Sequence, residues 1–383
     1  MKKADVYIAA TAAFLPNAAV ANNDMERLLG QIGDKPSRAR RLILRSNGIC
    51  SRYYAIDPQT LQQNFNNAEL TAEAVRALSW HDMPMSEIDC LSCGTSIADQ
   101  LMPNHAVMVQ GELGLPALEA VATTGVCASG MTALKYAYMG VATGQFASAV
   151  ATGSDLSSVH MRAANFDAEV LGNIEALGKQ PEIAFEKDFL RWMLSDGAGA
   201  MLLRDKPSSQ GLSLRIDWLD IFSFAGEMDT CMYAGAIKNT DGSLSGWRSM
   251  DASALAADSV MSIKQDVKLL NENVIAYTVE KPLQILQKKR AIDADDVDWF
   301  LPHYSSNFFR DKVYAGMLAA NFDIPQQRWF SNLVSKGNTG AASMFIMLDE
   351  LVRSGKLQRG NTVLCYVPES GRFSSAYLHA TVV

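Results

Sequence analysis

The sequence predicts an α/β protein built from two similar halves, in which two buried helices pack against each other between mixed β-sheets. Three observations lead to this prediction. The chain has 383 residues, which is too many for one ordinary hydrophobic core. Strand-like apolar runs alternate with helix-like runs along it. A unit of strand, loop, helix and strand also occurs twice, in the same order and at nearly the same separation.

The first expected strand lies in "VYIAATA", close to the start of the sequence. The preceding lysines and the short apolar run are also features of a secretory signal peptide, but Asp5 interrupts the charged region. No apolar run reaches about 18 residues, so we expect no transmembrane helix. The expectation is therefore a cytoplasmic protein with reduced thiols.

The first copy of the repeated unit lies within residues 86–153. "SEIDCLSCGTS" (86–96) contains an acidic turn, a buried strand and a loop of small residues. "GVCASGMTALKYAYMGVATGQFASAVATG" (125–153) then begins with a small-residue turn around Cys127, continues as an apolar helix that stops near Gly144, and ends in a buried strand.

The second copy follows the same plan. "DDVDWFLPHYSS" (295–306) contains the acidic turn, strand and loop, and "GNTGAASMFIMLDELVRSGKLQRGNTVLCYV" (337–367) contains the helix and the second strand. A glycine follows Asn338 by 17 positions, the same separation at which a glycine follows Cys127 in the first copy. The two copies therefore align without a gap across the helix.

The duplication predicts two halves, residues 1–210 and 211–383. The helices that follow Cys127 and Asn338 carry almost no charge in their first turns, and a helix that is apolar all round is buried. Two such helices at equivalent places would bring their N-termini close together. The loop after the strand of the second half would bring His303 to the same region.

Cys127 is the candidate nucleophile. A thiol reacts as the thiolate, and the unpaired N–H groups of a helix N-terminus lower the pKa of a cysteine placed there. We therefore expect a lowered pKa at Cys127. The alternative is that Cys127 is only a small buried residue. A reactive cysteine at this place would form a thioester with an acyl group.

His303 and Asn338 are candidate donors beside that thiol. A histidine at the end of a strand often has a structural role, and an asparagine at the start of a helix often caps it. Capping leaves the amide N–H₂ group of Asn338 free to donate. Together with a neutral His303, it would form a site for a developing oxyanion, as acyl transfer requires.

Composition and spacing make several other classes of function improbable. The net charge of −7 favours neither nucleic acid nor an anionic membrane as a partner. Cys90 and Cys93 form a C-x-x-C pair, but on a strand they would point to opposite faces. The five histidines lack the spacing of zinc enzymes, so we expect no metal site.

One basic cluster occurs, in "SRARRLILR", and it consists of Arg38, Arg40, Arg41 and Arg45. Two interpretations stay open. The cluster is either a solvated helix face or a binding site for a phosphorylated or acidic partner.

Five motifs carry a resemblance to a known family. They are Cys127 in its small-residue turn, His303 in "HYSSN", Asn338 in "GNTGAAS", "RSNGICSRYYA" (45–55) and "LSDGAGAMLL" (194–203). Together they resemble the β-ketoacyl-[acyl carrier protein] synthase III family, over nearly the whole chain. The resemblance implies the thiolase fold, with α-β-α-β-α layers. It also implies Cys127, His303 and Asn338 as the three catalytic residues.

The resemblance further implies the chemistry and the partners. Cys127 would take an acyl group from a CoA or carrier-protein (acyl-phosphopantetheine) thioester, without a metal or a tightly bound cofactor. His303 and Asn338 would stabilise the enolate of a malonyl or β-ketoacyl thioester during Claisen condensation. The backbone N–H of Cys127 would hold the oxyanion of the acyl step, and Ser370 or Gly371 would supply a second N–H where the family has its glycine-rich loop. The protein would be a homodimer in which Met102 reaches the partner's acyl pocket, unless Met102 only packs in a core.

Two departures from the family pattern stand out. The glycine-rich C-terminal loop reads "PESGRFSSAY", where Glu369 and Arg372 form either an ion pair or contacts with substrate. The family's entrance tryptophan motif is absent, and "RARRLILR" occupies that region. The absent tryptophan and the arginines that replace its motif favour a carrier-protein donor, whose acidic surface would suit the arginines. The two departures together favour a secondary-metabolite branch, such as dialkylresorcinol synthesis.

Three other functions stay open. The protein could be an acyltransferase that forms no carbon–carbon bond, or a non-catalytic partner subunit of an active homologue. The partner-subunit hypothesis is weakened because such subunits usually lack the cysteine or the histidine. A thiolase proper would need a second acid/base cysteine, and Cys365 lies in a strand-like run instead.

Overall fold

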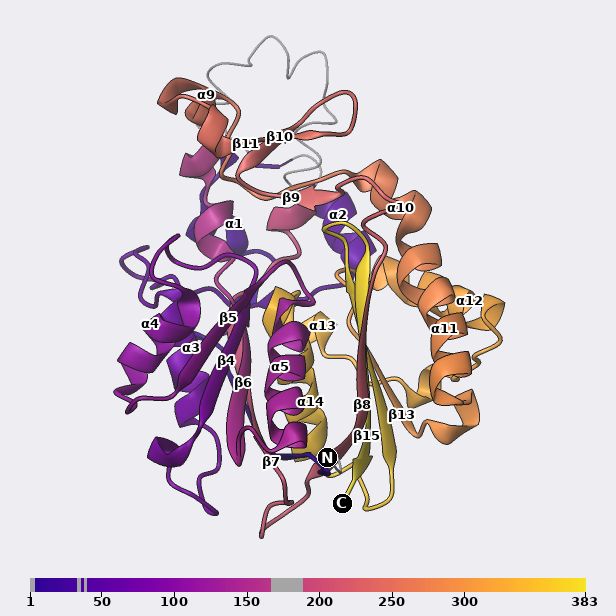
Figure 1. Cartoon of the computed structure of the whole chain (residues 1–383). Coiled ribbons are helices and arrows are strands. Elements are labelled where there is room, and N and C mark those ends of the chain that lie inside the picture. Colours follow the sequence, from indigo (N-terminus) through magenta and orange to yellow (C-terminus); the bar gives the residue numbers. More distant parts are fainter. Residues whose placement is uncertain (1–3, 33–35, 38–39, 167–188) are drawn as a thin grey trace.

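The computed structural model describes residues 4–32, 36–37, 40–166 and 189–383, and within them the main feature is one nine-stranded mixed sheet (Figure 1). Its strands, in order across the sheet, are β13 (Trp299–Pro302), β14 (Thr362–Glu369), β15 (Ser374–Val382), β8 (Leu214–Ser223), β1 (Tyr7–Phe14), β7 (Gly197–Arg204), β6 (Ser148–Asp155), β4 (Cys90–Thr95) and β5 (Glu119–Thr124). The first strand and both strands of each repeated unit are where the sequence predicts them.

The two sides of this sheet have the same strand order. On one side β4 runs parallel to β5 and β6, and β7 and β1 follow antiparallel. On the other side β13 runs parallel to β14, and β15 and β8 follow antiparallel. The order β4-β6-β7-β1 therefore matches β13-β14-β15-β8.

The second side lacks a full counterpart of β5. Its place is taken by a single parallel bridge between Phe300 and Trp329. The sequence prediction of separate sheets needs a correction, because the two sides join edge to edge. Tyr7 pairs with Arg215 and Ile8 with Leu214 at this junction, and the Ile216 N–H donates to the Val6 carbonyl at 2.8 Å.

The remaining elements are shorter strands and the helices. The short strands are β2 (Val20–Ala21), β3 (Ser51–Arg52), β9 (Met232–Tyr233), β10 (Ala236–Lys238), β11 (Leu244–Gly246) and β12 (Lys264–Gln265). The helices are α1 (Met25–Leu29), α2 (Arg40–Asn47), α3 (Asn67–Arg76), α4 (His105–Leu113), α5 (Ser129–Thr143), α9 (Ala252–Ala257), α10 (Val267–Ile275), α11 (Lys281–Arg290), α12 (Arg310–Ala319), α13 (Leu333–Lys336) and α14 (Ser343–Arg353).

Helices α5 and α14 lie side by side between the two parts of the sheet (Figure 1). Their apolar side chains share one core cluster with strands of both halves, including Leu134 of α5, Phe345 of α14, Leu203 of β7 and Val363 of β14. Helices α3 and α4 cover the outer face of the first part, and α10 to α12 cover the outer face of the second. These five layers, helix-sheet-helix-sheet-helix, confirm the predicted architecture.

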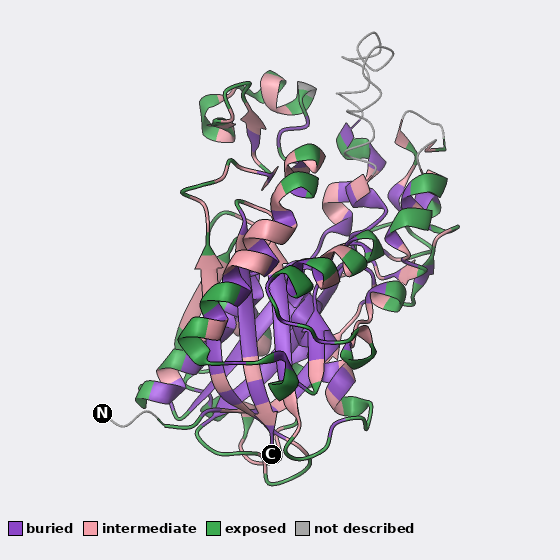
Figure 2. Ribbon diagram, turned by 90° about the vertical axis from the view of Figure 1, so that its right-hand side faces the viewer, coloured by how far each residue is buried: buried purple, intermediate pink, exposed green. Residues whose placement is uncertain are grey.

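The strands are the most buried part of the molecule, whereas the outer helices expose one face each (Figure 2). Helix α5 has buried residues along its whole length, as its uncharged first turn predicts. It ends at Gly144, whose φ of 74° is the left-handed conformation that stops many helices. Helix α3 begins with a capping box, in which Asn66 and Glu69 each bind the other's backbone N–H.

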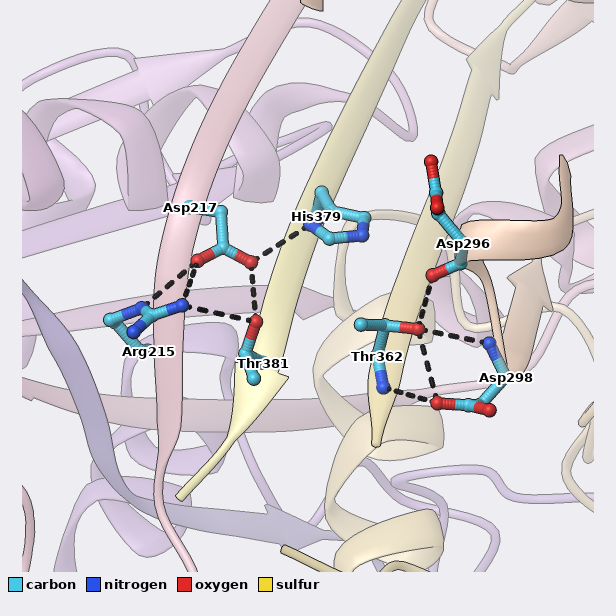
Figure 3. Close-up of polar contacts among 7 residues, drawn as sticks. All are labelled: Arg215, Asp217, Asp296, Asp298, Thr362, His379 and Thr381. Carbon is cyan, nitrogen blue, oxygen red and sulfur yellow. Dashed lines mark hydrogen bonds and ion pairs between the residues drawn. The ribbon is translucent and has the colours of Figure 1, made fainter. Parts of the chain in front are cut away.

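An equivalent aspartate ties together the strand starts in each half. The Asp298 carboxylate accepts the Thr362 N–H at 2.8 Å, which joins the starts of β13 and β14 (Figure 3). In the first half the Asp89 carboxylate accepts the Ser148 N–H at 3.1 Å, which joins the starts of β4 and β6. The acidic turn recognised in each half of the sequence therefore has the same structural role, which is to join the starts of two parallel strands.

A second polar cluster stabilises the pairing of β8 with β15. The Asp217 carboxylate accepts hydrogen bonds from Thr381 at 2.7 Å and from the His379 ring at 2.8 Å, and it pairs with Arg215 at 3.0 Å (Figure 3). The His379 ring stacks on Trp218. This histidine has a structural role far from the candidate site.

The matching strand orders support the division into residues 1–210 and 211–383, which we keep as a proposal. Cys90 and Cys93 belong to different core clusters and so lie on opposite faces of β4, as predicted. The described residues contain no group of three or more histidine, cysteine or acidic side chains arranged to hold a metal ion. No helix within the described ranges is long and apolar enough to cross a membrane.

Candidate active site

Cys127 lies in the turn between the end of β5 and the start of α5. Its side chain is partly exposed and lines two cavities that meet at this point. The turn is short because β5 ends at Thr124 and α5 begins at Ser129. The prediction of a cysteine at the start of a buried helix is confirmed.

His303 follows β13 directly, at the end of the strand where the sequence predicts it. Its backbone N–H donates to the carbonyl of Tyr366 on β14 at 2.8 Å, which fixes the position of the residue. The side chain is buried, and burial lowers the pKa of His303 to about 4. The imidazole is therefore neutral near pH 7, and it keeps one N–H that can donate to an oxyanion.

Asn338 is anchored by its backbone and by one side-chain atom. Its N–H donates to Met193 and its carbonyl accepts from Ser195, both at 2.9 Å. The side-chain Oδ1 accepts the Gly340 N–H at 3.0 Å, one residue before the N-cap position of the 3₁₀ turn Gly340–Ala342, which Thr339 occupies. Within the described part of the chain no acceptor takes the Nδ2 hydrogens, so this local hydrogen bond leaves the amide N–H₂ group able to donate.

Small residues bring the two helix starts together. A Cβ atom at Gly130, in the first turn of α5, would collide with the carbonyl oxygen of Ala341. A Cβ atom at Gly340 would collide with the Asp155 carboxylate, and its φ of 55° is also left-handed. Glycine at both positions is therefore required for Cys127 and Asn338 to line one site.

Asp155 completes this junction, and sequence reasoning missed it. It ends β6, and its carboxylate accepts the N–H groups of Ala341 at 2.6 Å and Ser96 at 2.8 Å. Burial raises the pKa of Asp155 to about 6, against the effect of these hydrogen bonds. The only signal in the sequence was an acidic residue that ends an apolar strand, in "AVATGSD".

The smaller of the two cavities contains the three candidate residues together. It has a volume of about 50 Å³ and is lined by Cys127, His303 and Asn338, with Ser370 and mostly apolar side chains around them. The structure thus brings together three residues that span more than 200 positions of the chain. A thiol and two side-chain N–H donors face one small space.

The larger cavity lies on the other side of Cys127. It measures about 550 Å³, within the usual range of ligand pockets, and also reaches Asn338. Its walls are largely apolar and include Ile97, Leu156 and Trp247. Such walls suit the hydrocarbon chain of an acyl group.

The predicted direction of the pKa of Cys127 is wrong. Burial, followed by the negative charges of Asp155 and Glu369, raises the pKa of this thiol. Desolvation of the thiolate outweighs the helix N-terminus. The thiol therefore stays protonated near pH 7, and a nucleophilic attack by its sulfur would require a proton acceptor.

The two backbone donors predicted for the oxyanion are consistent with the geometry. No acceptor among the described residues takes the N–H of Cys127 or of Ser370. The Ser370 hydroxyl accepts from Gln265 at 3.0 Å, and Ser370 lines the smaller cavity. Both N–H groups are therefore available to a ligand.

The arginine cluster divides into different environments. Arg38 lies outside the described residues. Arg40 pairs with Glu26 at 2.9 Å, donates to the Asn22 carbonyl and lies over the Trp192 ring, so its role is structural. Arg41 and Arg45 are exposed on α2.

Two other sequence motifs meet beside the site. In "RSNGICSRYYA" the Ala55 N–H donates to the Asp196 carboxylate of "LSDGAGA" at 2.7 Å. The Tyr53 N–H donates to the Ser195 hydroxyl at 2.9 Å. These contacts hold the segment from Met193 to Ser195, which anchors Asn338. Both motifs therefore help to fix the position of Asn338.

Met102 and Glu369 occupy contrasting places. Met102 is 84% exposed, so it does not pack in a core of this chain. Glu369 lines the larger cavity, and its carboxylate accepts two backbone N–H groups instead of pairing with Arg372. Arg372 donates to the Met228 carbonyl. The predicted ion pair between them is therefore absent from the described structure.

Comparison with known proteins agrees with these observations. The family described as 3-oxoacyl-[acyl-carrier-protein (ACP)] synthase III C terminal matches residues 287–374. A β-ketoacyl-[acyl-carrier-protein] synthase III of Xanthomonas oryzae pv. oryzae is 25% identical over 359 residues, which cover 93% of this chain and 92% of the relative.

Two solved structures have a similar fold. The tetronic acid condensing enzyme AbyA1 superposes with a TM-score of 0.74 at 19% identity, covering 98% of this chain and 99% of that one. OleA of Xanthomonas campestris, solved with lauric acid and lauroyl-CoA, superposes with a TM-score of 0.71 at 17% identity, covering 98% and 99%. The chain thus has the thiolase fold and, in sequence and in the motifs around Cys127, His303 and Asn338, is similar to the 3-oxoacyl-[acyl-carrier-protein] synthase III family of acyltransferase-type condensing enzymes.

Proposed function

We propose that the protein transfers an acyl group from a CoA or carrier-protein thioester to Cys127 and then condenses it with a malonyl or β-ketoacyl thioester. The observation that carries this proposal is the single cavity lined by Cys127, His303 and Asn338. Acyl transfer to Cys127 forms no enolate and needs no donors to stabilise one. Two neutral N–H donors beside it are what the stabilisation of an enolate requires.

In the first stage the Cys127 sulfur attacks the carbonyl carbon of the donor thioester. The carbonyl oxygen becomes an oxyanion, which the backbone N–H groups of Cys127 and Ser370 would hold. The donor thiol then leaves, and the acyl group stays on Cys127. The larger apolar cavity, which Cys127 also lines, would contain the acyl chain.

In the second stage the extender thioester forms an enolate, in the malonyl case by loss of CO₂. The enolate oxygen would accept hydrogen bonds from His303 and from the Asn338 amide. Its carbon attacks the acyl-Cys127 carbonyl, a carbon–carbon bond forms and the Cys127 sulfur leaves. The low pKa of His303 is compatible with this role, because the neutral ring keeps one N–H that can donate to the enolate oxygen.

The proposal includes an acyl carrier protein as a partner. Arg41 and Arg45 are exposed and would contact its acidic surface, and the sequence adds Arg38, which lies outside the described residues. Arg40 is a weaker candidate because Glu26 and Asn22 already occupy its guanidinium. The absent tryptophan motif supports a carrier protein over CoA and a secondary-metabolite pathway over the start of fatty-acid synthesis.

We also propose a cytoplasmic homodimer. All six cysteines are free thiols, as in a reducing compartment. Strand β5 is an edge of the nine-stranded sheet, and the exposed Leu101 and Met102 lie on the loop between β4 and α4. An unpaired strand edge near exposed apolar side chains suits a second copy, in whose acyl pocket Met102 would lie.

Intact-protein mass spectrometry tests the proposal. The chain is incubated with acetyl-, octanoyl- and lauroyl-CoA and with octanoyl-carrier protein, beside Cys127→Ala. We expect a mass gain of one acyl group that is lost in the variant and is discharged by malonyl-carrier protein with release of CO₂. Asn338→Ala should still be acylated but should condense about 100- to 1,000-fold more slowly.

The alternatives give different results in the same experiment. An acyl group that neither malonyl nor β-ketoacyl thioester discharges would identify an acyltransferase without carbon–carbon bond formation. Unchanged condensation by Asn338→Ala would lead to the same conclusion. Absence of acylation by every donor would identify a non-catalytic partner subunit.

A further inference from the structure

The carboxylate of Glu369 lies directly against the turn that carries Cys127. Its Oε2 atom accepts the N–H groups of Val126 and Ala128, each at 3.0 Å. These are the residues immediately before and after the candidate nucleophile. Glu369 ends β14, and it reaches this turn from a strand of the other half of the molecule.

The same contacts leave the rest of the carboxylate free. Both hydrogen bonds go to Oε2, and within the described chain no donor binds Oε1. Arg372, three residues further along, is engaged with the Met228 carbonyl and does not neutralise the charge. Glu369 and Cys127 line the same 550 Å³ cavity, and no hydrogen bond joins Sγ to the carboxylate in the described structure, so the proton would cross through one bridging water.

The thiol needs such an acceptor. Cys127 is held in its protonated form by burial and by the nearby negative charges of Asp155 and Glu369. His303 is a poor candidate, because a ring that holds a proton only near pH 4 is a weak base. The Asp155 carboxylate is already committed to Ala341 and Ser96.

We propose that Glu369 is the general base of the acylation step, an inference that rests on the proposed function of Cys127. As the Sγ–C bond forms, the thiol proton moves from Sγ to the Glu369 carboxylate. As the bond between the carbonyl carbon and the donor sulfur breaks, the proton passes from Glu369 to the leaving thiolate. The donor leaves as a neutral thiol, and Glu369 returns to its ionised form.

Two reactions of Cys127 in Glu369→Gln test this role. The amide oxygen can still accept from Val126 and Ala128, but the negative charge and the basicity are gone. Loss of the charge favours the thiolate, so alkylation of Cys127 by iodoacetamide should be several-fold faster, measured on the Cys127 peptide. Loss of the base should make acylation by octanoyl-CoA about 100-fold slower or more.

The opposite signs separate catalysis from a local electrostatic effect. Glu369 could instead only shift the ionisation of the Cys127 thiol, or only hold the turn around Cys127 in place. In either case Glu369→Gln should change the alkylation rate and the acylation rate in the same direction, and that result would overturn the proposal. Glu227→Gln is the matched control, because it makes the same change in an exposed carboxylate that pairs with Lys281. We expect it to change neither rate by more than about twofold.

Further outcomes are also distinguishable. If Glu369→Gln does not fold, as judged by circular dichroism, Glu369→Asp keeps the charge but withdraws it by one methylene. Slower acylation with unchanged alkylation then supports the base, and unchanged acylation overturns it. If the unmodified chain is not acylated by any donor, the proposed function fails, and the assignment of Glu369 fails with it.

Discussion

At the scale of single residues, the environment of each side chain decides what it can do. The sequence identified Cys127, His303 and Asn338 as one group, and the structure brings them to one cavity. It could not give the pKa of the thiol, because the desolvation of Cys127 and the charges of Asp155 and Glu369 come from distant parts of the chain. Motifs therefore predicted which residues meet but not how the surroundings shift the pKa of each side chain.

His303 should stay neutral over the working pH range. We expect its Cε1–Hε1 NMR signal, assigned with His303→Gln, to show no titration between pH 8 and 5.5, because burial lowers the pKa to about 4. The unfolded chain takes up this proton below about pH 6.5 and the folded chain only near pH 4, so the stability that depends on His303 decreases as the pH falls across that window. A midpoint near pH 6.5 would contradict a buried, uncharged donor.

At the scale of elements, the approach of α5 and α14 is set by glycine and not by large apolar side chains. Sequence patterns located α5 to within a residue, and Gly144 ends it as predicted, whereas a 3₁₀ turn, Gly340–Ala342, follows Asn338 and α14 begins only at Ser343. They did not reveal that the junction depends on Gly130 and on the carboxylate of Asp155. Such close backbone contacts do not appear in the hydrophobic periodicity of the sequence, because they depend on how two elements cross in space.

Gly130→Ala should therefore damage both fold and activity. The added methyl group meets the Ala341 carbonyl and the Phe345 ring, and overpacking of this kind costs about 1–3 kcal/mol of unfolding free energy. We expect a lower urea midpoint and at least tenfold slower condensation, since Cys127 and Asn338 would separate.

Gly111→Ala is the comparison for that experiment. Gly111 lies on an exposed part of α4, where no atom is close to an added Cβ. Alanine there should stabilise the protein by about 0.5–1 kcal/mol through helix propensity alone. Equal effects of the two substitutions on the urea midpoint would show that the junction has no special sensitivity.

At the scale of the whole molecule, the internal duplication was the most informative feature of the sequence. It predicted the architecture and the meeting of distant residues, and equivalent aspartates, Asp89 and Asp298, now support it. It could not predict that β1 and β8 join the two sides into one sheet, or that β5 has only a single bridge as its counterpart. Those differences depend on packing at the edges, where the two copies have diverged.

The dimer proposal makes a prediction at this scale. The 41.7 kDa chain should behave in light scattering as a particle of twice that mass. Met102→Glu should shift it toward the monomer, because a charge would enter an apolar interface at a residue that is 84% exposed in one copy. Phe308→Glu, on another surface, should not change the mass. A monomeric unmodified chain would contradict the proposal.

The position of α14 also has a consequence for biosynthesis. The Thr11 hydroxyl of β1 donates to Asp349 of α14 at 2.8 Å, and Met201 and Leu203 of β7 share a core cluster with Phe345. A ribosome delivers β1 and β7 long before it delivers α14. During synthesis the first half therefore exposes the apolar face that α14 later covers, and such a face favours binding by a chaperone. Folding is then completed late and slowly, because it depends on contacts between residues distant in the sequence.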